Sequence, residues 1–273
     1  RKFDYLKNTK INITADTLKI DIFNTHNLEK NSENKGKNII SFLNSKIKTS
    51  YKIENDTIVF NSINSKINNS NLDYDGKISI NPFDLNLDVN LDNYDLSKFF
   101  NSNSILNELI KTNLLFNKNI SMSSSMTTGS NLRNKIFQEA TINLNIVDGK
   151  LNINRTRLIN NKIGLLELEN SNLSFEDDRL ILNTEVIITI KDSNELFSLL
   201  QTNKKFRKPI KNILINLDYD FLSNEIKFNN IKINNKKISD ELLRISEGFN
   251  KKEVNNWNKS KRLLNDFFSI YEG

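Results

Sequence analysis

The stretch DGKISINPFDLNLDVNLDNYDLSKFF, residues 75–100, decides the fold class. Within it, Leu85, Leu87, Val89 and Leu91 alternate with Asn or Asp at every intervening position. This period of two is typical of a β-strand with one buried and one solvated face. An antiparallel sheet with one wet face produces such a pattern, whereas a parallel sheet covered on both sides does not. We therefore predict a mainly β protein built on an antiparallel sheet.

The residues around this strand predict how the chain enters and leaves it. The Asp75–Gly76 pair predicts a turn before the strand, and Asp92 or Asp95 can cap a short helical insert near residues 95–110. Residues 177–200 repeat the order of strand and helix, so a second helical insert is expected near residues 193–205. The inserts argue against an outer-membrane β-barrel, whose hairpins are rarely interrupted.

The same alternation extends over most of the chain. Strand patterns recur from residue 11 to residue 233, with the polar stretch 24–37 predicted as a loop that contains the lone His26. From about residue 236 the apolar period changes to helical spacing. We predict a long curved antiparallel β-meander, an open groove or twisted sheet, over residues 1–235, with the insert at 95–110 as a side excursion and not a crossover. An amphipathic helical tail follows over residues 236–273.

Composition narrows the chemistry. The chain of 273 residues has no Cys and a single His, which leaves no material for thiolate catalysis, His-dependent catalysis or Cys- or His-based metal sites. The net charge of +6 is spread over 39 basic and 33 acidic residues that intermingle along the chain, which indicates a solvated mixed surface and not a nucleic-acid site. We expect no enzyme activity, no cofactor and no metal.

The beginning of the chain carries no export or anchoring signal. It opens on RKFDYLKNTK without a Met, and no run of about eighteen apolar residues occurs. The expectation is that any membrane anchor lies upstream of these residues.

A succession of motifs resembles one known family. After residues 75–100 come LLFNKNISMSSSM, IFQEATINLNIVDGKLNINRTRL, EDDRLIL and NKKFRKPIKNILINLDYDFLSNEIKFNNIKIN. This order resembles the C-terminal region of AsmA-like proteins, which belong with TamB-type proteins among the repeated β-groove proteins of Gram-negative envelopes. The resemblance covers roughly residues 40–235.

The resemblance implies a role in the cell envelope. Such proteins are anchored in the inner membrane with their body in the periplasm, support outer-membrane biogenesis and integrity, and move phospholipid along a hydrophobic groove. Phospholipid or another acyl lipid is then the expected ligand, and a membrane surface or envelope proteins are the expected partners.

Alternating apolar residues could form such a groove without any directional chemistry, because acyl chains are held by burial of area. The residues expected to line it are Leu85, Leu87, Val89, Leu91, Met122, Met126, Ile142, Leu144, Ile146, Ile188 and Ile190. Alternation alone does not distinguish a groove wall from a closed core, so both interpretations stay open.

An alternative function class is a structural β-scaffold that docks a partner or membrane surface through its helical tail. The residues expected on that surface are Trp257, Lys261, Arg262, Phe267 and Phe268. The opposing interpretation is that the tail covers an open end of the sheet.

Overall fold

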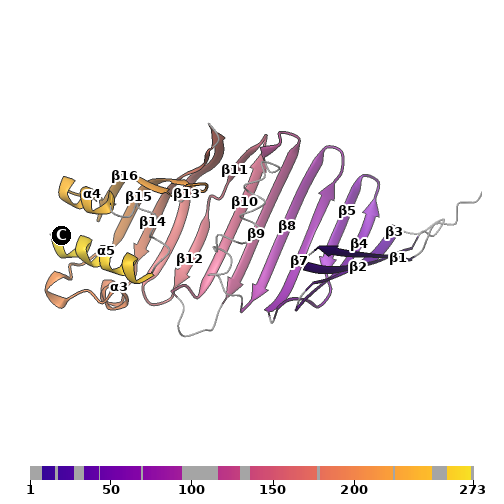
Figure 1. The fold of residues 1–273 in the computed structure, drawn as a ribbon, viewed down its shortest axis with the longest axis horizontal. Coiled ribbons are helices and arrows are strands. Elements are labelled where there is room, and N and C mark those ends of the chain that lie inside the picture. The colour runs from indigo at the N-terminus through magenta and orange to yellow at the C-terminus, as the bar shows by residue number, and fades with distance from the viewer. Residues whose placement is uncertain are drawn as a thin grey trace, which may run out of the picture.

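The computed structural model describes residues 8–15, 18–27, 34–42, 44–68, 70–93, 116–129, 136–176, 179–223, 225–247 and 257–271. Within these ranges, one continuous 17-stranded sheet forms the body of the protein (Figure 1). The first strands are β1 (Asn8–Ala15), β2 (Leu18–Asn27), β3 (Asn34–Phe42), β4 (Ser45–Glu54), β5 (Thr57–Ser62), β6 (Ser65–Ile67), β7 (Ser70–Ser79), β8 (Phe83–Asp92) and β9 (Ile120–Gly129).

The remaining elements combine strands with helices. They are β10 (Glu139–Val147), β11 (Lys150–Asn152), β12 (Thr156–Asn160), β13 (Gly164–Glu176), β14 (Arg179–Ile190), α3 (Ser193–Leu200), the 3-10 helix η2 (Lys204–Phe206), β15 (Asn212–Asp220), β16 (Glu225–Ile233), β17 (Lys236–Lys237), α4 (Asp240–Ser246) and α5 (Trp257–Ile270). The prediction of a mainly β chain with a helical C-terminal region is confirmed.

Strands pair in chain order along the sheet, and all pairs but one are antiparallel. The exception is β8 with β9, which run parallel from Phe83↔Ile120 to Asp92↔Gly129. For β9 to run parallel to β8, the chain must return to the end of the sheet at which β8 begins, so the connection between them is a crossover. The prediction of a side excursion was wrong on this point. The helix expected near 95–110 lies outside the described residues.

At two places in the sheet a strand is divided into two shorter strands. At each break a side-chain hydroxyl forms a hydrogen bond with the backbone of the neighbouring strand. β5 and β6 share one place between β4 and β7, and at their junction Ser65 Oγ accepts from Lys48 N at 2.8 Å and donates to Lys48 O at 3.0 Å. β11 and β12 share the place between β10 and β13, where Thr156 Oγ1 accepts from Asn143 N at 3.2 Å. Breaks of this kind bend a strand and increase its twist.

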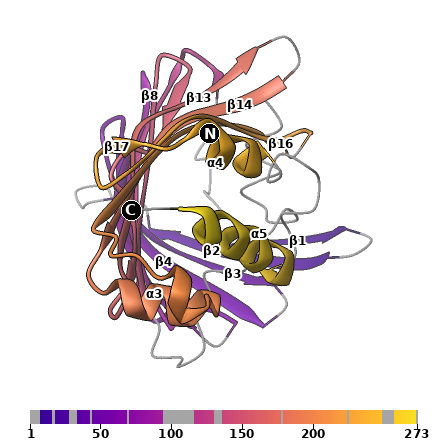
Figure 2. The ribbon, with the colours of Figure 1, turned by 90° about the vertical axis from the view of Figure 1, so that its left-hand side faces the viewer.

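The sheet curves along its length into a trough. Figure 2 shows the strands following an arc, with α3, α4 and α5 on its inner side at the C-terminal end. These helices pack on the last strands in one core that includes Ile190, Phe197, Ile213, Ile233 and Phe268. Asp192 begins α3 as its N-cap, accepting from Asn194 N at 2.8 Å, so the insert predicted at 193–205 is confirmed as α3 and η2.

Two local predictions were wrong. The stretch 24–37 is no continuous loop, because β2 extends to Asn27 and β3 begins at Asn34. The Asp75–Gly76 pair lies inside β7, where Gly76 is needed for space: a Cβ there would collide with the Asn86 carbonyl oxygen and lie 2.6 Å from the Phe60 ring. The predicted repeat also fails in detail, since its first copy spans a β7–β8 hairpin and its second copy is the single strand β14 followed by α3.

Candidate functional site: the concave face

The concave face is defined as the set of residues that point to the inner side of the trough, the side on which the helices pack. Cross-strand partners share a face of a sheet, so register identifies its members. In the middle strands, Leu85 pairs with Met122 and Met122 with Ile146, while Val89 pairs with Met126 and Met126 with Ile142.

The next strands continue the same rows toward the helices. Ile146 pairs with Leu151, Leu151 with Leu173 and Leu173 with Leu182. Leu182 is on β14, and the even-numbered Ile188 and Ile190 of that strand point to the same side. All eleven residues expected to line a groove therefore lie on the concave face.

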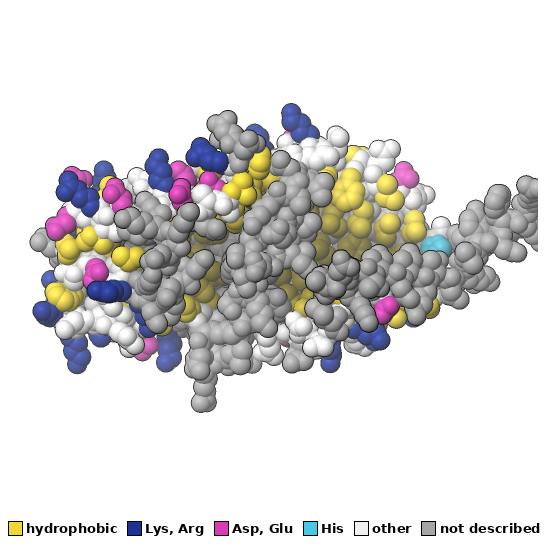
Figure 3. All heavy atoms as spheres, viewed as in Figure 1, with side chains coloured by type: hydrophobic (Ala, Val, Ile, Leu, Met, Phe, Trp, Pro, Cys, Tyr) yellow, Lys and Arg dark blue, Asp and Glu magenta, His cyan; other side chains and the backbone are white. Residues whose placement is uncertain are grey.

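These eleven residues differ in how deeply they are buried. Ile146 is fully buried, at 0% exposure, and Leu91 and Ile190 are buried at 4% and 8%. The other eight are half-buried: Leu85, Leu87, Val89, Met122, Met126, Ile142, Leu144 and Ile188. Figure 3 shows hydrophobic side chains gathered in the hollow over β5 to β8. The central part of the concave face thus keeps apolar area that the described residues do not fully cover.

Ile146 belongs to a small core at one rim of the trough. It packs with Leu151, Leu173, Leu180 and Leu182, and the partly buried residues around them include Phe116, Met122, Leu144, Tyr219 and Phe221. A side chain with no exposed area packs against its neighbours and is not available to contact a ligand. The groove interpretation therefore fits the half-buried residues better than it fits Ile146.

Charge is distributed asymmetrically between the two faces. Along the described strands β2 to β16, the positions in register with the concave rows hold apolar, aromatic, amide, hydroxyl or glycine residues, His26 among them, and none holds Lys, Arg, Asp or Glu. In β8 the opposite, convex side carries Asp84, Asp88 and Asp92. Since 26% of all residues are charged, their exclusion from one face is a strong selection for an uncharged surface.

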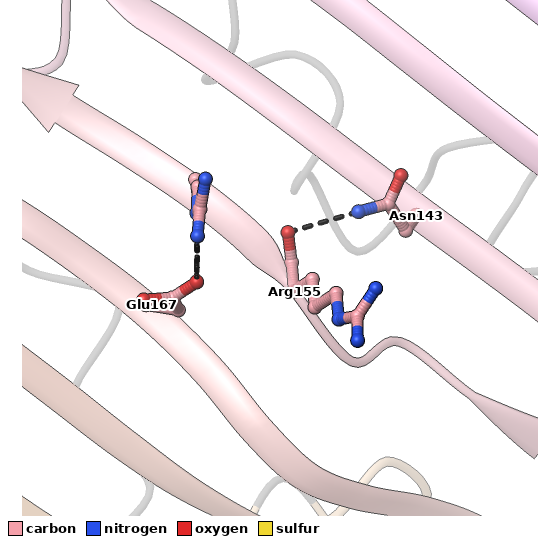
Figure 4. A network of polar contacts seen from close by, with 4 residues as sticks. Asn143, Arg155 and Glu167 are labelled. Atoms are coloured by element: carbon pink, nitrogen blue, oxygen red, sulfur yellow. Dashed lines mark hydrogen bonds and ion pairs between the residues drawn. The ribbon is translucent and has the colours of Figure 1, made fainter.

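The convex face is instead a solvated polar surface with local pairs. Arg157 Nε donates to Glu167 Oε1 at 2.7 Å across the β12–β13 pair, and Asn143 Nδ2 donates to the Arg155 carbonyl at 2.9 Å (Figure 4). Both contacts are exposed, so each contributes little to stability. Nothing in this network converges on a cavity.

A polar cluster that the sequence analysis missed lies on the concave face toward the N-terminal end. We define the aromatic-polar cluster as Asn24, His26, Asn38, Thr49, Tyr51 and Tyr74. Tyr51 Oη donates to Asn24 Oδ1 at 3.0 Å and lies 3.2 Å from His26 Nδ1, with the two rings stacked at 5.8 Å. Thr49 Oγ1 and Tyr74 Oη lie 2.5 Å apart.

The backbone places these groups together by the same register that builds the apolar rows. His26 pairs with Gly36 and Gly36 with Tyr51, and the tyrosine ring occupies the space where a side chain at Gly36 would lie. The signal in the sequence was the spacing of Asn24 and His26, which are two residues apart and therefore lie on the same face of β2. It was hidden because the surrounding Asn-rich residues suggested a loop.

The C-terminal tail covers the other end of the trough. Phe267 and Phe268 are buried at 7% and 3% exposure, and Phe268 makes edge-to-face contacts with Phe197 and Phe267 at 5.4 Å. The expectation that these two phenylalanines form a membrane or partner surface was wrong, because their helix places them against the sheet. Arg262 is exposed, Lys261 is half-buried, and the side chain of Trp257 lies outside the described residues.

Among the described residues, the pKa values that are clearly shifted belong to two tyrosines, Tyr219 and Tyr271, and both are raised by burial. Burial, and secondarily the charge of Asp220, raises the pKa of the Tyr219 phenol above its ordinary value of 10.0. Within the described ranges, no three His, Asp or Glu side chains are grouped so that they could hold a metal ion. A helix long and apolar enough to cross a bilayer is likewise not found in this part of the chain.

Comparison with known proteins identifies no relative: no protein family, curated protein or solved structure matches this chain.

Proposed function

We propose that the chain is a non-enzymatic lipid-binding protein that holds the acyl chains of phospholipid or another acyl lipid on its concave face. The observation that carries the proposal is the continuous uncharged concave face, which stays half-exposed at Leu85, Leu87, Val89 and Met126. An acyl chain offers no hydrogen bonds and no charge, so a wall without Lys, Arg, Asp or Glu is what it requires.

The energetics of such binding follow from area. A fully buried methylene contributes about 0.8 kcal/mol, so an acyl chain that buries half the area of ten methylenes gains about 4 kcal/mol. Met122 and Met126 face the hollow from β9, and their flexible thioethers adapt to chains of different shape. A row of such contacts along the trough would let a chain slide without a large barrier at any one strand.

We further propose that the protein acts in the cell envelope as an AsmA-like protein. Under this proposal it is anchored to the inner membrane through an upstream segment, extends into the periplasm, and supports outer-membrane biogenesis by passing phospholipid along the trough. What supports it is the order of sequence motifs together with a long curved sheet whose inner face is apolar.

The alternative of a scaffold that docks through its tail has less support. Its apolar anchors, Phe267 and Phe268, are packed against Phe197 and Leu200 inside the protein. Phe267 and Phe268 of α5 therefore cover an end of the trough and are not presented to a partner.

Gentle purification followed by native mass spectrometry tests the lipid proposal. The expected result is a protein that carries phospholipid in stoichiometric amount, and a double variant with Leu87→Asp and Val89→Asp that folds but carries none. Recovery of a reproducibly lipid-free wild-type protein that also takes up no added lipid would contradict the proposal.

A further inference from the structure

In the aromatic-polar cluster, hydrogen-bonding side chains of the concave face converge from neighbouring strands. Its Tyr51 and Asn24 are already paired, as are Thr49 and Tyr74. Asn38 lies between them, because it pairs with Asn24 on one side and Thr49 on the other. The neighbouring strands β2, β3 and β4, with Tyr74 of β7, thus bring amide, phenol and hydroxyl groups to one spot in an uncharged trough.

Among the described residues, the cluster offers two acceptors to a ligand, Asn38 Oδ1 and His26 Nε2. Asn38 Oδ1 is buried and has no hydrogen-bond partner among the described residues. Tyr51 donates its hydroxyl proton to Asn24, so it accepts from His26 Nδ1, and a neutral imidazole then keeps Nε2 as an acceptor. A buried amide oxygen without a partner is costly, and a donor supplied by a ligand would remove that cost.

The position of the cluster relative to the apolar rows suggests what the ligand is. Four ladder steps separate β3 from β8, which at about 4.8 Å per step is about 19 Å, comparable with the length of a long extended acyl chain. A chain lying over β7 and β8 would therefore bring its head group to β2–β4. No Lys or Arg on the concave face of the described strands could neutralise a bare anion there.

We infer that the aromatic-polar cluster binds the head group of an acyl lipid that carries hydroxyl or amine donors, with donors directed at Asn38 Oδ1 and His26 Nε2. This inference rests on the proposed function, since it gives an orientation to a lipid already held by the trough. It also sets a preference: donor-bearing heads bind better than heads that only accept. Because Asn38 Oδ1 is buried, its amide must rotate about the Cβ–Cγ bond, which is a soft torsion, to accept from the head group.

The test uses monolauroylglycerol and methyl laurate, which share the acyl chain and the ester and differ in the head, a dihydroxypropyl group in the first and a methyl group in the second. Both are titrated calorimetrically into the delipidated full chain below their aggregation concentrations. Two added hydrogen bonds predict about tenfold tighter binding of monolauroylglycerol by the wild-type protein. Asn38→Ala is expected to reduce this preference to less than about threefold while leaving the affinity for methyl laurate unchanged.

Two further variants separate binding from folding. His26→Phe keeps a ring beside Tyr51 but removes the imidazole acceptor, and it should lower the preference in the same direction. Asn86→Ala changes the same type of side chain on the exposed convex face and should leave the preference intact. Thermal unfolding of the ligand-free variants checks that each is folded. If one of the two cluster variants, Asn38→Ala or His26→Phe, fails to fold, the comparison uses the other cluster variant.

The outcomes distinguish the inference from the proposed function. Equal binding of the two probes by the wild-type protein, or a preference that survives both cluster variants, would overturn the head-group site and leave the lipid trough standing. If neither probe binds, the proposed function fails and this inference fails with it.

Discussion

Replacing Leu87 by Asp separates a groove wall from a closed core. Leu87 lies on β8 between Gly76 and Ser124, and it is half-buried. Full burial of a leucine side chain is worth about 1.5–3 kcal/mol, so half of that, about 1 kcal/mol, is lost with the side chain. The lower β-propensity of Asp adds up to about 1 kcal/mol. Leu87→Asp should therefore lower the free energy of unfolding by about 1–2 kcal/mol.

The effect on lipid binding should be larger than the effect on folding. An acyl chain passing this position would have to strip water from the carboxylate or stay away from the wall. If about six half-buried methylenes lose contact, each worth about 0.4 kcal/mol, the loss is about 2.4 kcal/mol, or roughly fiftyfold in affinity. Urea unfolding followed by circular dichroism measures the first quantity, and titration with monolauroylglycerol measures the second.

Ser123→Asp is the matched control, because Ser123 is exposed on the convex face of the adjacent strand and pairs with Asn86 and Asn145. Surface substitutions of this kind usually change stability by less than about 0.5 kcal/mol, and lipid affinity should not change. A loss of more than about 4 kcal/mol for Leu87→Asp would mean that the residue is core, because such values come from buried charges and cavities. Unchanged lipid affinity in a folded Leu87→Asp protein would refute the groove.

Three other predictions concern the C-terminal helix α5, the break between β5 and β6, and the loss of stability at high pH. Phe268→Ala should lower the free energy of unfolding by about 3–5 kcal/mol in urea titrations, since the ring is 3% exposed; a loss below about 1 kcal/mol would show that the tail does not hold the end of the sheet. Ser65→Ala should lower the free energy of unfolding by about 1–3 kcal/mol in the same assay, because the Lys48 N–H loses its acceptor. An unchanged free energy of unfolding would show that the Ser65 hydroxyl does not stabilise the break. The pKa of Tyr219 is raised, so its contribution to stability is intact below about pH 10 and is lost as pH rises through the pKa of the folded state. Tyr219→Phe should therefore reduce the loss of stability at high pH. A variant whose stability has the same pH profile as the wild-type protein would show that the pKa of Tyr219 is not shifted.

Much of the sheet could be predicted because alternation along one strand is a local property. In residues 83–92 every second side chain is apolar, and the structure places Leu85, Leu87, Val89 and Leu91 together on one face. Where a strand is continuous, parity at one position fixes the face of all the others. The eleven expected groove residues occupy the apolar parity of four strands, and register places all four apolar sides on the concave face.

The parts that could not be predicted depend on partners distant in the sequence. The parallel pairing of β8 with β9 is decided by where the chain returns, and nothing in the residues of either strand encodes its direction. Gly76 looked like a turn residue because its other use, leaving room for the Phe60 ring from a neighbouring strand, requires knowing the register. The aromatic-polar cluster depends on register as well, because Asn24, Asn38 and Thr49 meet only when β2, β3 and β4 are paired.

Burial was the least predictable property of the candidate site. Ile146 and Leu144 are two residues apart on one strand and share a face, yet Ile146 is fully buried and Leu144 is half-buried. The difference arises from the local core around Leu151 and Leu180, which covers one rim of the trough. Phe267 and Phe268 were placed on a surface for a related reason, since an amphipathic helix shows that it has an apolar side but not what that side contacts.

The position of a bound acyl chain is the central claim, and site-specific photocrosslinking measures it directly. A benzophenone side chain introduced singly at positions 85 to 90 samples both faces of β8, and crosslinked lipid is quantified by mass spectrometry of the intact chain. We expect crosslinks at Leu85, Leu87 and Val89 and none at Asn86, Asp88 and Asn90. Crosslinks of equal yield at all six positions, or at none of them in a protein that carries lipid, would contradict the claim.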